Sequence, residues 1–389
     1  MEGKTLKKEL LEYFDYSTSL PTASSLVQRR SQIKPEALKQ LFDTLTKEAL
    51  ENRTDLSDFL FLAIDGSEFF CFGDPDDADT RVKFEKRNGY NALHLNGLYD
   101  LEHRVFLDAV VQPIHKKNEH LAAQKMIDGY NLPSNAVVIM DRGYACYNTM
   151  AHVEQKGLYY LIRAKDITSC SIVSSLKDQL PEQDCFDVNV HFFVTKKRNK
   201  LTKDHPELYK RIRNDQTFDY LTEENPYYEM NLRIVRIKLS DDSYECLLTN
   251  LPQDKAGTEL LKAMYFKRWG IETSFRELKY AIGLASFHSE KYDFVLQEIW
   301  ARLLLYNYCE MITTKVAENL KKKTKKHVYQ LNYTNAIFVC RRFFRHKSKK
   351  SPFDAEKLIK QELLPIRPDR RHPRKVKARS FISFLYRIA

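Results

Sequence analysis

The sequence predicts an α/β protein with a mixed sheet, a β-rich insertion and then a helix that carries a glutamate. Two short apolar runs, residues 59–64 and 136–140, are each followed by an aspartate and, within two residues, by a glycine. Continuous apolar runs of this length are typical of buried strands. Residues 165–255 are polar with alternating strand-like pieces, which indicates an insertion. Residues 257–284 carry an apolar stripe at helical spacing.

Helices are expected at the start of the chain. Pro21 and Pro35 each stand where a helix can begin, because proline fits the first helical turn. Residues 1–55 are therefore predicted to form a small helical region, and Arg29, Arg30 and Lys34 give it basic charge.

The expected order from residue 59 onward is strand, strand, strand, helix, strand, helix, strand. The first strand ends at Asp65-Gly66-Ser67, and a polar loop, 73–80, follows it. The later elements are strands 92–99, 104–111, 136–140 and 158–163, helices 119–130 and 145–155, insertion strands 186–195, 230–239 and 244–249, and helices 257–284 and 295–320. We expect five units: a helical region (1–55), a first core segment (56–164), the insertion (165–255), a second core segment (256–320) and a basic region (321–389).

Composition excludes several classes of protein. Hydrophobic residues make up 43% of the 389 residues, which is typical of a globular domain. No apolar run reaches the ~18 residues of a membrane span, and the first residues lack the apolar core of a signal peptide. The seven cysteines are scattered without a Cys-x-x-Cys pair, which argues against a zinc ribbon and favours a reducing cytoplasm.

Positive charge is concentrated at the C-terminal end. Residues 321–389 hold 21 Lys or Arg and 4 Asp or Glu, a balance of +17, whereas the rest of the chain has a balance of −6. A basic tail on a slightly acidic body is typical of a nucleic-acid binder, although a solvated tail is the alternative. Nucleic-acid contact is favoured because apolar and aromatic residues interleave with the charges, as a disordered tail rarely shows: Phe343, Phe344, Ile366, Phe381, Phe384 and Tyr386.

One predicted helix carries a carboxylate among potential phosphate binders. Its spacing is Tyr-x2-Arg-x3-Glu-x6-Lys, and on an ideal helix these four residues fall within roughly a 60° arc. Arg276 widens the arc to roughly 80°. The four residues of the spacing are Tyr265, Arg268, Glu272 and Lys279.

Two aspartates share a context that predicts a metal site. Asp65 and Asp141 each follow an apolar strand, and ligands collect beyond strand ends in open sheets. Together with Glu272 they offer only oxygen ligands, which suit Mg²⁺ or Mn²⁺. Two such ions are able to clamp the attacking and leaving oxygens of a phosphoryl transfer.

Each of these carboxylates also has a simpler interpretation. A strand-terminal aspartate near a glycine is often a turn residue or a helix cap. Glu272 is able to pair along the helix with Arg268 or Arg276. The metal site is favoured because the three occur together in the expected fold order.

These motifs resemble the DDE transposases of bacterial insertion sequences, in particular the insertion sequence four family. The signature of that family is Tyr-x2-Arg-x3-Glu-x6-Lys, which Tyr265, Arg268, Glu272 and Lys279 match in full. Its two aspartates follow strands as Asp65 does, and as Asp141 does in Asp-Arg-Gly-Tyr. The order Asp, Asp, β-rich insertion, Glu also matches.

The resemblance implies a ribonuclease H-like catalytic core and cut-and-paste DNA transposition with two Mg²⁺ or Mn²⁺ ions. Asp65, Asp141 and Glu272 would be the catalytic, metal-binding residues. The resemblance implies that Tyr265, Arg268 and Lys279 hold DNA phosphates, and we expect Arg276, on the same helix face, to join them.

The expected partners are the inverted-repeat ends of a transposon, target DNA and a second copy of the chain, in a bacterial cytoplasm and at the nucleoid. Residues before the first strand are few for this family. Repeat recognition is therefore expected to rely on 1–55 and the basic tail, unless the chain is a shortened copy. The alternatives are a ribonuclease H-like nuclease or resolvase that only hydrolyses DNA, and a catalytically silent DNA-binding protein derived from a transposon.

Overall fold

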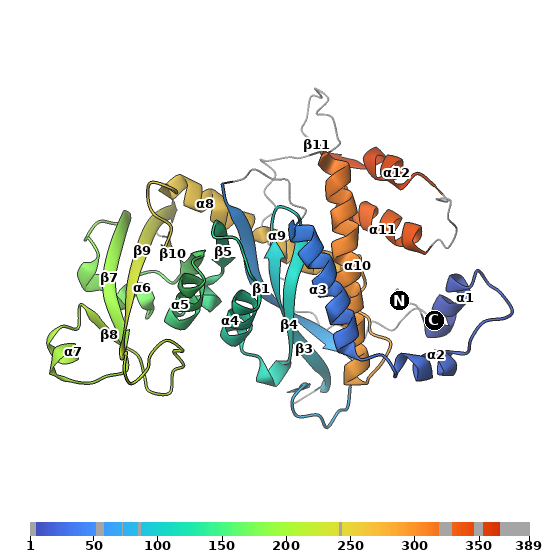
Figure 1. Cartoon of the computed structure of the whole chain (residues 1–389), viewed down its shortest axis with the longest axis horizontal. Coiled ribbons are helices and arrows are strands. Elements are labelled where there is room, and N and C mark those ends of the chain that lie inside the picture. The colour runs from blue at the N-terminus through green and yellow to red at the C-terminus, as the bar shows by residue number, and fades with distance from the viewer. Residues whose placement is uncertain are drawn as a thin grey trace.

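Three helices precede the first strand, and both helices and strands occur along the rest of the chain (Figure 1). The structure, a computed structural model, describes residues 5–51, 58–71, 73–84, 87–240, 243–318, 329–345 and 353–365. The helices are α1 (Leu6–Tyr13), α2 (Ala23–Arg30), α3 (Pro35–Glu51), α4 (Glu119–Gly129), α5 (Tyr147–Gln155), α6 (Ile172–Ser175), α7 (Lys200–Asp204), α8 (Thr258–Lys267), α9 (Trp269–Tyr280), α10 (Tyr292–Glu318), α11 (Tyr333–Phe344) and α12 (Ala355–Gln361). The strands are β1 (Leu60–Cys71), β2 (Arg81–Phe84), β3 (Arg87–Asp100), β4 (Val105–Pro113), β5 (Ala136–Met140), β6 (Tyr159–Ala164), β7 (Phe186–Thr195), β8 (Tyr209–Arg211), β9 (Tyr227–Ser240), β10 (Ser243–Thr249), β11 (Tyr329–Leu331) and β12 (Leu363–Pro365). The expected α/β class is confirmed.

Ten of the described strands form one mixed sheet. Strands β4, β3 and β1 are antiparallel neighbours, and β1, β5 and β6 are parallel neighbours. The order β4-β3-β1-β5-β6, three antiparallel strands beside two parallel ones, is the expected ribonuclease H-like arrangement. The parallel part places Ile64 of β1 next to Met140, the last residue of β5.

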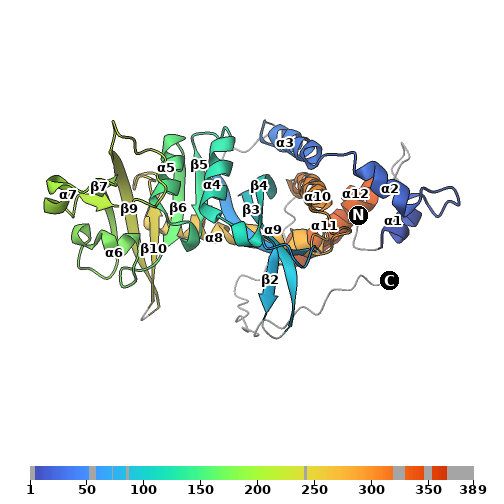
Figure 2. The ribbon, with the colours of Figure 1, turned by 90° about the horizontal axis from the view of Figure 1, so that it is seen from below.

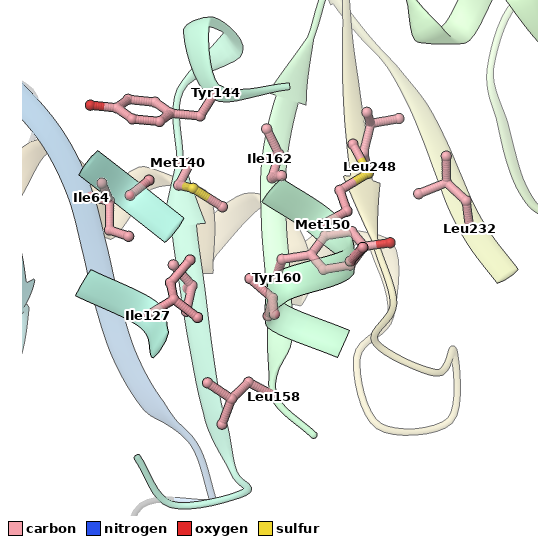
Figure 3. Close-up of a cluster of buried hydrophobic side chains, with 14 of the residues drawn as sticks. Ile64, Ile127, Met140, Tyr144, Met150, Leu158, Tyr160, Ile162, Leu232 and Leu248 are labelled. Atoms are coloured by element: carbon pink, nitrogen blue, oxygen red, sulfur yellow. The ribbon is translucent and has the colours of Figure 1, made fainter. Parts of the chain in front are cut away.

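Side chains alternate along β1 and enter cores on opposite faces of the sheet. Leu62 and Ile64 belong to a cluster that α4 and α5 cover (Figure 3). Phe61 packs with α8, and Ala63 packs with α9, on the other face. Figure 2 shows these two pairs of helices on either side of the sheet. Full burial of a Val, Leu, Ile or Phe side chain contributes about 1.5–3 kcal/mol, so both layers fix β1 firmly.

The β-rich insertion extends the sheet. Strand β10 pairs antiparallel with β6, and β9, β7 and β8 follow it outward. Two buried arginines of β9 tie this region together, because Arg233 pairs with Asp187 and Arg236 with Asp166, each at 2.7 Å. The insertion therefore continues the ribonuclease H-like sheet past β6.

The first strand is longer than the sequence predicts. Strand β1 continues to Cys71 because β3 pairs with it along that whole length, whereas its pairing with β5 stops at Ile64. The expected end of this strand at 65–67 is therefore wrong. Asp65 lies within a strand and at the end of its parallel pairing.

The expected helix 257–284 is also wrong in one respect, because it is two helices. Helix α8 ends at Lys267, α9 begins at Trp269, and Arg268 joins them. The Arg268 N–H donates to the Tyr265 carbonyl at 3.1 Å, and the Ile271 N–H donates to the Arg268 carbonyl at 3.1 Å. This three-residue spacing tightens the turn, and such tight turns within helices often mark hinges.

The expected helical N-terminal region consists of α1, α2 and α3. Helix α3 lies along α10, where the rings of Phe42 and Trp300 are 5.5 Å apart (Figure 1). From the last turn of α2, Arg30 donates to Gln297 of α10 at 2.7 Å. Part of this region is therefore packed on the core.

The C-terminal basic region includes α11 and α12, which pack against α10. Ala336, Ile337 and Cys340 of α11 are buried, while Phe343 and Phe344 are each 36% exposed. The predicted contacts at Ile366, Phe381, Phe384 and Tyr386 lie outside the described residues. Among the helices that the structure describes, none has both the length and the apolar character needed to cross a bilayer.

Candidate active site

The end of the parallel pairing between β1 and β5 brings Asp65 and Asp141 close together. Ile64 and Met140 are the last partners in the parallel pairing of β1 with β5, so the next residue of each strand is an aspartate. The Gly66 N–H donates to Asp65 Oδ1, and the Gly143 N–H donates to Asp141 Oδ1, both at 2.8 Å. Each aspartate therefore has one carboxylate oxygen fixed by the backbone.

The third predicted carboxylate comes from α9, and an arginine connects it to the first. Arg268 Nη1 lies 3.1 Å from Asp65 Oδ2, and Arg268 Nη2 lies 2.8 Å from Glu272 Oε1. Helix α9 is held over the sheet because Ile271 and Phe275 pack into the buried cluster below it. The pairing of Glu272 with Arg268, which the simpler interpretation expected, is present, and it includes Asp65 as well.

The electrostatics of the site favour an additional cation. Burial raises the pKa of Asp65 to about 6, although the Gly66 N–H and Arg268 act in the opposite direction. Asp141 and Glu272 contribute to the increase in pKa as neighbouring negative charges. Two of the three carboxylates contact the Arg268 guanidinium, and carboxylate oxygens are the ligand type that hard divalent cations prefer.

The donor set fits a divalent metal, but the side chains have not converged around one point. Among the described residues, no group of three His, Cys, Asp or Glu side chains is arranged so as to hold an ion. Arg268 instead links Asp65 to Glu272. Asp65, Asp141 and Glu272 are the residues that would hold the metal.

Arg268 is enclosed by aromatic rings. Its guanidinium carbon lies 5.7 Å from the Tyr265 ring centre and 5.4 Å from the Trp269 ring centre. The residue is only 7% exposed, and its Nε is buried without a hydrogen-bond partner in the described structure. A DNA phosphate therefore cannot reach this guanidinium unless the side chain moves.

The other predicted phosphate binders differ in accessibility. Tyr265 is buried in the cluster under α8, and burial raises its pKa. Lys279 is half-buried above the Phe69 ring, and burial lowers its pKa. Arg276 is exposed. The predicted residues do not lie along one ideal helix, because the junction at Arg268 separates α8 from α9. Of the four predicted phosphate binders, Arg276 and Lys279 are the more accessible.

Several residues close to the aspartates were not identified from the sequence. The Tyr144 hydroxyl donates to Asn96 at 3.4 Å, and burial, with Asp65 as the next cause, raises the pKa of Tyr144 well above its usual value. His94 is buried and lies 3.0 Å from Glu119. The sequence could have indicated Tyr144, because this residue ends the Asp-Arg-Gly-Tyr segment that contains Asp141. No sequence spacing relates His94 to the aspartates.

Comparisons with known proteins identify the family of the chain. Residues 57–308 match the family described as Transposase DDE domain. A stretch of 125 residues is 30% identical to the transposase InsG for insertion sequence element IS4 from Escherichia coli strain K12. It covers 30% of this chain and 28% of that protein, so the chain spans less than a third of that relative. A solved structure of the piggyBac transposase synaptic complex with hairpin DNA is similar with a TM-score of 0.41 and 11% identity, over 78% of this chain and 56% of that one.

Proposed function

The chain belongs to the Transposase DDE domain family, and on that premise we propose that it is a DNA transposase that cuts and joins DNA strands with the help of divalent metal. The observation that carries the proposal is the placement of the three carboxylates: Asp65 and Asp141 directly follow the last paired residues of β1 and β5, and Arg268 links Asp65 to Glu272 of α9. These are the three carboxylates that the transposase resemblance implies, in the expected fold order.

Each carboxylate has a proposed role. Asp65, Asp141 and Glu272 would hold two Mg²⁺ or Mn²⁺ ions, and Asp141 and Glu272 are both close enough to Asp65 to raise its pKa as negative charges. Bound metal supplies Lewis-acid stabilisation of the phosphoryl transfer and a more acidic water or hydroxyl. The backbone N–H groups of Gly66 and Gly143 orient two of the aspartate oxygens.

The proposed substrate is double-stranded DNA, namely the ends of an insertion sequence and a target. Arg276 and Lys279 of α9 would hold phosphates of this DNA, which is supported by the exposure of Arg276 and the partial exposure of Lys279. The basic balance of residues 321–389 supports broader contact with the DNA backbone. Because a mobile element has two ends and each chain offers one such site, we propose that two copies assemble on the DNA.

Replacement of Asp141 by Asn tests the chemistry. The variant should bind the terminal-repeat duplex as the parent does, while single-turnover strand cleavage in Mg²⁺ should fall at least about a hundredfold, or ~2.7 kcal/mol in barrier. Asp215→Asn is the matched control, because Asp215 is exposed and pairs with Arg213, and it should cleave normally.

The results for the parent protein and for Asp141→Asn distinguish the proposed transposase from the alternative functions. Near-normal cleavage by Asp141→Asn would refute the proposed site. Cleavage by the parent without joining of the cut end to target DNA would favour the nuclease or resolvase. Binding without cleavage by the parent would favour a catalytically silent DNA-binding protein.

A further inference from the structure

Arg268 lies in a position that a metal ion would need. Its guanidinium nitrogens contact Asp65 Oδ2 at 3.1 Å and Glu272 Oε1 at 2.8 Å. An Mg²⁺ ion binds carboxylate oxygens at about 2.0–2.1 Å and demands near-octahedral geometry. The guanidinium stays charged at all accessible pH values, so it repels a cation that approaches the same oxygens. The two cations therefore compete for Asp65 and Glu272.

We propose that Arg268 is an internal counter-ion for Asp65 and Glu272, and that a DNA phosphate draws it away so that these carboxylates are released to bind metal. The inference rests on the proposed function and adds an order to it, in which the DNA backbone arrives before the metal site is complete. In this account Arg268 is a positioning residue that acts through the two carboxylates.

Local structure allows the side chain to leave. Arg268 lies at the tight junction between α8 and α9, where backbone hydrogen bonds have three-residue spacing. The buried Nε–H of Arg268 has no hydrogen-bond partner in the described structure, so one donor of the side chain is unsatisfied in this position. The Trp269 ring, whose centre lies 5.4 Å from the guanidinium carbon, is 42% exposed. A change of the Arg268 side-chain rotamer past this ring would carry the guanidinium toward solvent.

A phosphate is a suitable alternative partner. A guanidinium binds phosphate through two parallel hydrogen bonds, as it binds a carboxylate, so the transfer exchanges one charge-assisted contact for another. Without DNA, metal binds only the fraction of molecules in which Arg268 has left, and the apparent affinity falls by that fraction. By linkage, DNA and metal must then strengthen each other's binding by the same factor.

Metal binding by the full-length protein tests the proposal directly. Mn²⁺ is titrated at one fixed pH, and the free ion is followed by electron paramagnetic resonance, so that the readout is independent of cleavage. Without DNA, Arg268→Gln should bind Mn²⁺ at least about tenfold more tightly than the parent. Lys267→Ala is the matched control, because it removes a neighbouring positive charge that pairs with Glu102 at 3.1 Å, and it should resemble the parent. Equal or weaker Mn²⁺ binding by Arg268→Gln would overturn the proposal.

Repeating the titration with a duplex separates this inference from the proposed function. DNA should tighten Mn²⁺ binding by the parent, and Arg268→Gln should reduce that tightening at least about tenfold. If the parent and the variant gain equally from DNA, only the role of Arg268 is refuted. If no form of the protein binds Mn²⁺ at this site even with DNA, the proposed metal-dependent function fails.

A second measurement leaves Arg268 intact, so it applies even if the variant fails to fold. The chain has two tryptophans, and Trp300 is buried against Phe42, so Trp300→Phe leaves Trp269 as the only indole. Saturating Mg²⁺ alone must displace Arg268 and should therefore shift the Trp269 emission. An unchanged spectrum while Mg²⁺ is bound would also overturn the proposal.

Discussion

Gly66 shows how closely the backbone beside Asp65 is packed. A Cβ added at this glycine would lie 2.3 Å from His94 Nε2 and 3.2 Å from Asn96 Oδ1. His94 is only 3% exposed and lies 3.0 Å from Glu119, so it has little room to withdraw. The Gly66 N–H also donates to Asp65 at 2.8 Å. Any shift of this backbone therefore moves the first carboxylate of the site.

Gly66→Ala is accordingly expected to destabilise the protein by about 1–3 kcal/mol, the usual cost of overpacking a core. Strand cleavage should fall more than this loss of stability explains, because Asp65 is displaced. The free energy of unfolding comes from urea denaturation, and the cleavage rate is measured well below the transition. Gly129→Ala is the control, since a Cβ there meets no atom within 4 Å. Equal effects of the two substitutions would contradict the packing argument.

At this scale, spacing and strand context indicated the three carboxylates but not their partners. Asp65 and Asp141 were recognisable because each follows a short apolar run in the sequence. Helical periodicity placed Arg268 beside Glu272, yet it gave no information on Asp65, which contacts Arg268 from 203 residues away. Periodicity also placed Tyr265 on the functional face, whereas the packing of α8 on the sheet buries it. Helical periodicity predicts which residues share one face of a helix, but it does not predict which distant elements contact that face.

Helix α9 is positioned by Arg104, which follows the turn between β3 and β4. Arg104 Nη2 lies 2.9 Å from Glu277 of α9, and its Nε lies 2.7 Å from Glu310 of α10. Its guanidinium carbon is 3.8 Å from the centre of the Tyr333 ring of α11. Burial raises the pKa of Glu310 to about 7 even with Arg104 beside it. One arginine thus joins the glutamate helix to the long helix and to the C-terminal region.

Arg104→Met should therefore cost about 3–5 kcal/mol of unfolding free energy, because it leaves two buried carboxylates without their cation. Arg213→Ala, which removes a pair that is more than 70% exposed on both sides, should cost under about 1 kcal/mol. Chemical denaturation at neutral pH measures both variants. The double variant Arg104→Met with Glu310→Leu should recover part of the loss. Failure of the double variant to recover any stability would argue that Arg104 acts mainly through the backbone of its turn.

The order of elements was predictable from the sequence, whereas their pairing was less so. Apolar runs and glycines indicated β5 with its observed bounds and β4 and β6 to within two residues, whereas β1 and β3 are longer than predicted. The tight turn that divides α8 from α9 has no proline, and its Gly270 is explained only by contact, since a Cβ there would lie 2.9 Å from Leu101. Similarly, no local pattern states that β10 pairs with β6, because the residues between them form the insertion.

On the scale of the whole molecule, the basic C-terminal region has two segments with different roles. Residues 329–345 and 353–365 contribute α11 and α12, whose buried side chains pack on α10 and support the core. Cutting the chain at residue 341 would therefore remove part of a packed helix together with positive charge. Residues 366–389 follow the last described strand and hold 8 Lys or Arg against 1 Asp. A cut after Pro365 removes much of the charge and leaves all described elements in place.

Deletion of 366–389 is the variant that tests how this charge binds DNA. If about four of the eight basic residues neutralise phosphates, the slope of log K against log salt should become less steep by roughly 3–4, since each phosphate contributes about −0.9. The loss of affinity should be similar for repeat-end and unrelated duplexes, because phosphate contacts position a protein without reading sequence. Fluorescence anisotropy across a salt series measures the slopes, and circular dichroism with thermal unfolding verifies that the shortened chain keeps its fold. Arg276→Ala and Lys279→Ala, in the full chain, should each reduce the slope by about 1. A folded, shortened protein with the parent's slope would show that residues 366–389 do not contact the DNA backbone, and that binding depends on the folded core around α9.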